Sequence, residues 1–272
     1  MGIMAPVPQR AQLAQPEGES RPSHAEFLGL PFCLLSQPEV VRRVIAHSGT
    51  PYRYVVTPNA AHIVTVHDEP EHLLPVYRGA WLSLCDSRVV RALARLDGRS
   101  LPLVTGSDLV AALLSALNVS DPARQRRLLI VGPPRAAAKA LRAAYPDLTF
   151  DILPAPAGLA QQAELRLAVA RACVAQPWDI LLLCVGFPAQ ELIARQIADL
   201  GHTGGVALCV GASIDFLAGT RIRAPLWLRN LSLEWAYRLA QEPRRLWRRY
   251  LVESPKILRI FMAKRLPRGL AR

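Results

Sequence analysis

The segment ILLLCVGFPAQE, residues 180–191, decides the fold of this chain. Its first six residues are apolar, a run far too short to cross a bilayer and typical of a fully buried β-strand. A turn with Gly and Pro follows directly, and residues 189–200 then have the spacing of an amphipathic helix. A buried strand that passes through a short turn into a helix is the repeating unit of a parallel α/β sheet.

The same unit recurs along most of the chain. Further strands are predicted at residues 54–57, 81–85, 127–131, 148–153 and 206–210. Further helices are predicted at residues 38–47, 70–79, 88–96, 107–117, 135–145 and 159–175. This alternation predicts the α/β class, with a Rossmann-like, mostly parallel sheet and flanking helices over residues 28–220. A composition of 51% hydrophobic and 20% charged residues excludes a disordered or fibrous chain.

The basic residues are concentrated at the C-terminal end. The 272-residue chain has a formal net charge of +12, and residues 221–272 hold 14 Lys and Arg against 3 Asp and Glu. The sequence therefore predicts a nearly neutral α/β body followed by a basic helical appendage, with amphipathic helices over residues 231–251 that break at Glu242-Pro243. Its Trp, Tyr and Arg side chains suit the surface of an anionic membrane. Residues 256–272 are expected to be solvated or in weak contact with lipid.

Two other classes of protein remain open for this appendage. Aromatic side chains interleaved with arginines could stack on bases and hold phosphates, as in a nucleic-acid-binding protein. That class leaves the polar residues of the body without a role, so we expect no nucleic-acid partner. The second alternative is a non-catalytic scaffold in a polysaccharide assembly complex.

The N-terminal segment and the cysteines indicate a cytoplasmic protein. Residues 1–27 are rich in Pro, Gln, Glu and Ser and lack an apolar core flanked by positive charge, so they predict a disordered leader and no secretory signal. The five cysteines are widely spaced and form no Cys-x-x-Cys pair, which argues against disulfide and metal roles: Cys33, Cys85, Cys173, Cys184 and Cys209.

Polar residues follow the carboxyl ends of successive predicted strands, where open α/β sheets bind their ligands. This pattern predicts a pocket for a polar small molecule. The residues are Thr57 and Asn59, Asp86, Thr105, Gly106, Ser107 and Asp108, then Gly186, Gln190 and Glu191, and finally Gly211 and Asp215. Asn59, Asp86 or Ser107 could each be only a helix N-cap, the interpretation that we favour for Ser107. Five such motifs at five successive strand ends favour a site.

Motifs that would hold a metal or a common nucleotide cofactor are absent from the sequence. It contains no Asp-x-Asp, no G-x-G-x-x-G and no G-x-x-x-x-G-K-[ST]. His62, on an apolar helical stretch, does not form a metal triad with His67 and His72, and we expect all three to be structural or solvated. No metal and no cofactor are therefore predicted.

The order of these motifs resembles the WecG/TagA/CpsF family, glycosyltransferase family 26. The resemblance covers about residues 28–260. Its long C-terminal part reads Arg223-Ala224-Pro225, then LEWAYR at residues 233–238 and QEPRR at residues 241–245. It implies a bacterial enzyme that transfers a sugar, N-acetylmannosamine or glucose, from a UDP-sugar to a polyprenyl-diphosphate-linked sugar. The transfer would proceed with inversion and without a metal, in cell-surface or exopolysaccharide synthesis.

The resemblance also implies roles for single residues. Asp86 matches the general base that removes the proton of the attacking hydroxyl. Thr57 and Asn59 match residues that line the pocket, and Gln190 matches a residue that contacts the reacting sugars. Arg238, Arg245 and Arg248 match arginines that reach the donor or lipid diphosphate. Thr105, Gly106, Asp108, Gly186, Glu191, Gly211 and Asp215 are predicted substrate-binding residues, with Asp215 expected to bind the uridine. We expect a cytoplasmic protein, peripheral on the inner face of the plasma membrane and able to form homo-oligomers.

Three positions depart from the family pattern. Ser87 follows the predicted base where the family has Gly, Leu103 stands where it has Arg, and Ala189 stands where it has Lys. These departures leave open an exopolysaccharide branch with another donor sugar, such as glucose, or a weakly active relative.

Overall fold

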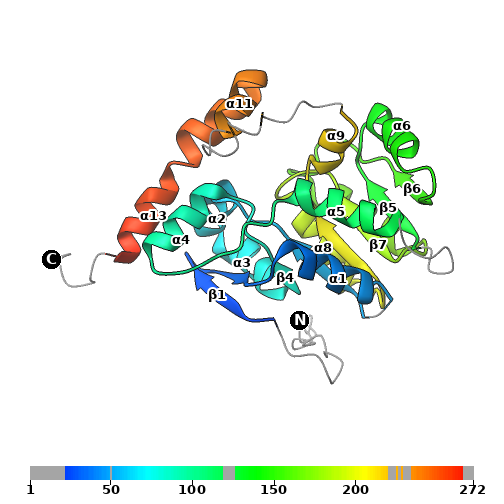
Figure 1. Cartoon of the computed structure of the whole chain (residues 1–272), viewed down its shortest axis with the longest axis horizontal. Coiled ribbons are helices and arrows are strands. Elements are labelled where there is room, and N and C mark those ends of the chain that lie inside the picture. The colour runs from blue at the N-terminus through cyan, green and yellow to red at the C-terminus, as the bar shows by residue number, and fades with distance from the viewer. Residues whose placement is uncertain are drawn as a thin grey trace, which may run out of the picture.

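The structure, a computed structural model, describes residues 22–49, 51–118, 126–219, 225, 228 and 234–265. One six-stranded sheet organises these residues (Figure 1). Its strands are β3 (Arg53–Val56), β4 (Leu82–Ser83), β5 (Leu128–Val131), β6 (Phe150–Leu153), β7 (Ile180–Leu183) and β8 (Val206–Cys209). They lie in the order β4-β3-β8-β7-β5-β6, and every pairing is parallel. The predicted α/β class is confirmed, and each predicted strand is present.

The helices follow the predicted pattern closely. They are α1 (Gln37–Ala46), α2 (Ala60–Asp68), α3 (Pro70–Gly79), α4 (Arg88–Leu96), α5 (Gly106–Asn118), α6 (Arg135–Ala144), α7 (Ala163–Val174), α8 (Ala189–Asp199) and α9 (Ser213–Leu217). The bounds predicted for α3 and α4 are correct. Helix α7 begins four residues later than predicted, because residues 157–161 form a separate turn, in which the amides of Gln161 and Gln162 both donate to the carbonyl of Gly158. The short helix α9 was not predicted, and for α2 only a helical stretch around His62, without bounds, was expected.

Successive strand residues point to opposite faces of the sheet and divide the core in two. Val55, Ile130 and Leu208 pack with α1, α5, α6 and α9. Tyr54, Leu183 and Cys209 pack on the other face with α2, α3, α4, α7 and α8. Because strands β5, β7 and β8 are buried along their whole length, apolar runs without alternation identify them in the sequence.

A short hairpin precedes the sheet and corrects the predicted N-terminal boundary. Strands β1 (His24–Phe27) and β2 (Leu30–Cys33) pair in antiparallel register through a turn in which Leu28 and Gly29 have φ values of 48° and 80°. The expected leader included residues 24–27, but Phe27 is fully buried in the core, which orders this strand. Residues 1–21 lie outside the described residues.

The C-terminal segment forms α11 (Glu234–Gln241), α12 (Pro243–Trp247), the π-helical turn η2 (Arg248–Glu253) and α13 (Lys256–Arg265). The helix break predicted at Glu242-Pro243 is confirmed. Residues 256–272 were expected to be solvated or in weak contact with lipid, but Ile257 and Phe261 of α13, one turn apart, are buried in the core against α2 and the hairpin. One face of α13 is therefore packed rather than solvated, and lipid contact stays a prediction for its exposed face. Figure 1 shows α13 lying alongside α2 and α4. Residues 266–272 lie outside the described residues.

Candidate active site

The carboxyl ends of β4, β3, β8 and β7 are neighbours in the sheet. The polar residues that follow these strands in the sequence are therefore brought to one edge, as predicted. An isolated parallel bridge between Cys85 and Leu103 extends this edge and brings in the loop that starts α5. Leu103, one of the departures from the family pattern, is thus used as a β-bridge residue.

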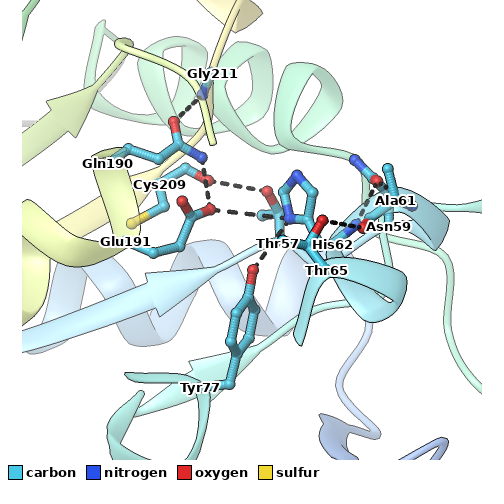
Figure 2. A network of polar contacts seen from close by, with 10 residues as sticks. All are labelled: Thr57, Asn59, Ala61, His62, Thr65, Tyr77, Gln190, Glu191, Cys209 and Gly211. Carbon is cyan, nitrogen blue, oxygen red and sulfur yellow. Dashed lines mark hydrogen bonds and ion pairs between the residues drawn. The ribbon is translucent and has the colours of Figure 1, made fainter. Parts of the chain in front are cut away.

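The side chain of Gln190 joins two of these strand ends (Figure 2). Its Oε1 accepts a hydrogen bond of 2.8 Å from the backbone amide of Gly211, and its Nε2 donates one of 2.9 Å to Oε1 of Glu191. Gln190 is only 3% exposed. It therefore fixes the loop after β8 relative to the first turn of α8.

Glu191 was predicted as a substrate-binding residue, but its side chain is completely buried. In this conformation its side chain is therefore not accessible to a substrate. It instead accepts the hydrogen bond that holds the amide of Gln190. Its Oε1 lies 3.9 Å from Nδ1 of His62. Because a buried carboxylate is costly unless it is paired, these contacts are what allow Glu191 to sit there.

His62 is the residue of this network that sequence reasoning did not assign to the site. Its ring stacks on Phe187 with centroids 4.0 Å apart, and its Nδ1 lies 3.2 Å from the hydroxyl of Tyr77. The signal in the sequence was its place three residues after Asn59, in the first turn of the helix that the site motif begins. His62 thus links α2 to the turn after β7.

Thr57 and Asn59 order the loop after β3. The hydroxyl of Thr57 donates a hydrogen bond of 2.9 Å to the carbonyl of Cys209 and is buried, so it ties the end of β3 to the end of β8. Asn59 is the N-cap of α2, because its Oδ1 accepts from the amides of Ala61 and His62 at 3.0 and 3.4 Å. The capping interpretation is therefore correct for Asn59.

Asp86 lies next to this loop at the end of β4. Its backbone amide donates to the carbonyl of Pro58 at 3.1 Å, and its side chain is half-buried. The N-cap of α4 is Ser87, whose hydroxyl accepts from the amide of Val90 at 3.2 Å. The alternative that Asp86 is only a helix cap is thus wrong. Burial, with the charge of Asp86 as a smaller cause, raises the pKa of the Cys85 thiol to about 12, so that thiol stays protonated and unreactive.

Thr105, Gly106 and Asp108 build the start of α5. The hydroxyl of Thr105 donates to Oδ2 of Asp108 at 2.7 Å and accepts from the Asp108 amide at 3.2 Å. Thr105 therefore caps the helix, and the cap predicted at Ser107 is two residues too late. A Cβ on Gly106 would lie 3.2 Å from Oγ of Ser213, so this glycine allows α5 to pack against the turn after β8.

The remaining predicted positions lie on the turns after β7 and β8. Gly186 and Gly211 have φ values of 80° and 57°, which favour glycine. Asp215 is half-buried on α9, and its charge adds to the effect of burial in raising the pKa of the Cys184 thiol. Helix α9, which carries Asp215, packs on the opposite face of the sheet from α2, which carries His62.

Residues 25–270 match the family described as "Glycosyl transferase WecG/TagA/CpsF family". The chain belongs to this family. It is also 25% identical over 256 residues to the N-acetylglucosaminyldiphosphoundecaprenol N-acetyl-beta-D-mannosaminyltransferase of Staphylococcus aureus (strain MW2), covering 91% of this chain and 94% of that protein.

This WecG/TagA/CpsF glycosyltransferase carries its predicted diphosphate-binding arginines on the C-terminal helices. Arg238 lies on α11, Arg245 on α12 and Arg248 on η2, but their side chains lie outside what the structure describes. Among the described residues, no group of three His, Cys, Asp or Glu side chains could hold a metal ion. No helix in the described part of the chain is long and apolar enough to span a bilayer.

Proposed function

We propose that this glycosyltransferase transfers a hexose or N-acetylhexosamine from a UDP-sugar to a polyprenyl-diphosphate-linked sugar, with inversion and without a metal ion, in the synthesis of a bacterial surface polysaccharide or exopolysaccharide. The observation that carries the proposal is the position of Asp86. This carboxylate follows the end of β4, and its backbone is hydrogen-bonded to Pro58 beside Thr57 and Asn59, while Ser87 supplies the helix cap. The name of the staphylococcal relative supports N-acetylmannosamine as the first donor to test, with glucose as the alternative.

In the proposed reaction Asp86 is the general base. A sugar hydroxyl is a weak nucleophile, so the carboxylate takes its proton as the oxygen attacks the anomeric carbon of the donor. The bond from that carbon to the UDP oxygen breaks in the same displacement, so the configuration at the carbon inverts. UDP leaves with additional negative charge, which Arg238, Arg245 and Arg248 would stabilise in place of a metal.

The hydrogen-bond network around Gln190 supports this use of the site. Gln190 is held at both ends of its amide, by Gly211 and by Glu191, so the loops after β7 and β8 keep a fixed separation. A donor nucleotide at the carboxyl edge of the sheet would lie against these loops. We assign Gln190 to the positioning of the reacting sugars, and Glu191 and His62 to the support of Gln190.

The C-terminal helices would bring the enzyme to its lipid-linked substrate. Several of their large apolar side chains are more than a third exposed, among them Trp235 at 37%, Trp247 at 51% and Leu251 at 55%. Exposed aromatic side chains on basic helices favour the interface of an anionic membrane. The proposed location is therefore the inner face of the plasma membrane.

Asp86→Asn tests the proposed base. The variant should release UDP at least about 100-fold more slowly than the wild type when given a UDP-sugar and a lipid-linked acceptor. Asp147→Asn removes an exposed carboxylate before β6 and should leave the rate unchanged. Equal rates for Asp86→Asn and the wild type would show that Asp86 is not the base. If no UDP-sugar binds the wild type, the scaffold alternative gains support.

A further inference from the structure

The outer face of α4 carries a row of arginines that the proposed reaction does not use. Arg88, Arg91 and Arg95 are spaced by three and four residues, so they lie on one face of the helix over about 10 Å. The opposite face, with Val90, Leu93 and Ala94, is buried in the core. The pKa of Arg91 is lowered, first by burial and then by the neighbouring positive charges of Arg95 and Arg88.

These three charges are not balanced within the described part of the chain. No ion pair there includes Arg88, Arg91 or Arg95, although the nearby Arg99 and Arg265 both pair with Asp97. The first turn of α4 also contains no acidic residue, although the helix dipole favours anions at that end. Like charges at this spacing repel one another. An anionic ligand would relieve both effects.

Exposed apolar side chains lie on α4 and on the neighbouring helix α13. On α4, Val89 is 39% and Leu96 is 65% exposed. The end of α13 lies beside the end of α4, since Arg265 donates a hydrogen bond to the carbonyl of Leu96 (Figure 1). On α13, Leu258 and Met262 are 52% and 56% exposed, one turn apart. Basic side chains next to exposed apolar ones are typical of a surface that lies in a membrane interface.

We propose that α4, together with α13, is a lipid-contacting surface of the α/β body that binds the phosphate groups of an anionic bilayer. We call it the α4–α13 surface, formed by Arg88, Val89, Arg91, Arg95, Leu96, Leu258 and Met262. The body itself then docks on the membrane, beyond the C-terminal helices α11 and α12.

The position of α4 in the chain gives this docking a consequence for the site. Helix α4 begins two residues after Asp86, so a bilayer against the arginine row brings the end of β4 close to the headgroup layer. The diphosphate of a lipid-linked acceptor lies in that layer. This consequence depends on the proposed function, whereas the binding of anionic lipid does not.

Vesicle sedimentation with the full chain tests the proposal. The wild type should bind vesicles of phosphatidylcholine with phosphatidylglycerol and not vesicles of phosphatidylcholine alone. Each arginine near an anionic surface contributes about 1 kcal/mol, so the triple variant Arg88→Gln, Arg91→Gln, Arg95→Gln should bind at least about tenfold more weakly. Raising the salt concentration should weaken wild-type binding in the same direction.

The matched control removes three charges from another helix. Arg135, Lys139 and Arg142 lie on α6, at the far end of the molecule from α4 in Figure 1, and the same three changes to Gln should alter binding by less than about twofold. Equal losses in the two variants, or none in the α4 variant, would overturn the proposal. So would retention of single-stranded DNA by the wild type without binding to phosphatidylglycerol. Thermal unfolding of both variants shows whether they are folded. The salt dependence of wild-type binding tests the proposal even if a variant does not fold.

A separate assay distinguishes a failure of this proposal from a failure of the proposed function. Wild-type UDP release with a water-soluble, short-chain prenyl-diphosphate sugar requires no vesicle. If the wild type releases no UDP, the transferase reaction is contradicted and the sedimentation result is unaffected. If the wild type releases UDP but the α4 variant sediments with vesicles as the wild type does, only the proposed α4–α13 surface is contradicted.

Discussion

The buried carboxylate of Glu191 lies 3.9 Å from Nδ1 of His62 and binds the amide of Gln190 with the same oxygen (Figure 2). The contact joins α8, which follows β7, to α2, which follows β3. The polar residues at the edge of the sheet thus rest on two polar residues beneath them, Glu191 and His62, which are buried. Substitutions of these two buried residues should affect both stability and activity.

Glu191→Ala removes a buried, hydrogen-bonded carboxyl group. The free energy of unfolding should fall by about 3 kcal/mol, measured by urea denaturation. The kcat of sugar transfer should fall more than about tenfold, because the amide of Gln190 loses one of its two fixed contacts. Glu191→Gln keeps an oxygen acceptor and should recover part of both losses.

The control for this prediction is Glu164→Ala, which removes an exposed carboxylate from the first turn of α7. It should leave kcat unchanged. A Glu191→Ala enzyme as active and as stable as this control would show that Gln190 does not depend on Glu191.

The helix caps near the site make a second prediction. Ser87→Ala and Thr105→Ala should each lower the free energy of unfolding by about 1 kcal/mol, because each leaves helix amides without a side-chain acceptor. Ser107→Ala should have almost no effect, since Thr105 is the cap. Thermal or urea unfolding measures all three, and a larger loss for Ser107→Ala than for Thr105→Ala would contradict the assignment.

Gly106 makes a third prediction, on the packing of α5 against the turn after β8. In Gly106→Ala the added Cβ would lie 3.2 Å from Oγ of Ser213 and 3.4 Å from the carbonyl of Val210. We expect a loss of about 1 kcal/mol in unfolding free energy and weaker donor binding, because the turn that carries Gly211 must shift. Gly49→Ala meets no atom within 4 Å and serves as the control. Wild-type donor affinity in Gly106→Ala would show that this turn tolerates the shift.

Asp97 makes a fourth prediction, on the docking of α13. The hydrogen bond from Arg99, with the charges of Lys264 and Arg265, lowers the pKa of Asp97 below its ordinary value of 3.8. A lowered carboxylate pKa stabilises the fold above the ordinary value, and the contribution is lost as the pH falls through the lowered pKa. Asp97→Asn should therefore speed hydrogen exchange of α13 amides at pH 7, and the difference from the wild type should shrink under strongly acidic conditions.

Asp199→Asn removes a carboxylate that pairs with Arg195 on α8 and should leave α13 exchange unchanged. If Asp97→Asn also leaves it unchanged, the apolar contacts of Ile257 and Phe261 hold the helix alone.

The placement of much of the candidate site could be predicted from the sequence, because its signals are local. Asp86, Thr57 and Gln190 each follow an apolar run within a few residues, and the carboxyl ends of parallel strands share one edge. The roles of Ser87 and Thr105 were harder to predict, since several neighbouring hydroxyl and carboxyl groups can cap the same helix. Only backbone geometry distinguishes them.

The sequence by itself determined the α/β class, the strands and the motif order, because hydrophobic periodicity and turn residues act over about ten residues. The tertiary structure alone decided the strand order, the burial of Glu191 beside His62 and the docking of α13 on α2. Each of these depends on contacts between segments far apart in the chain. His62 and Glu191 are separated by more than a hundred positions, and neither residue's own neighbours indicate that the two side chains meet.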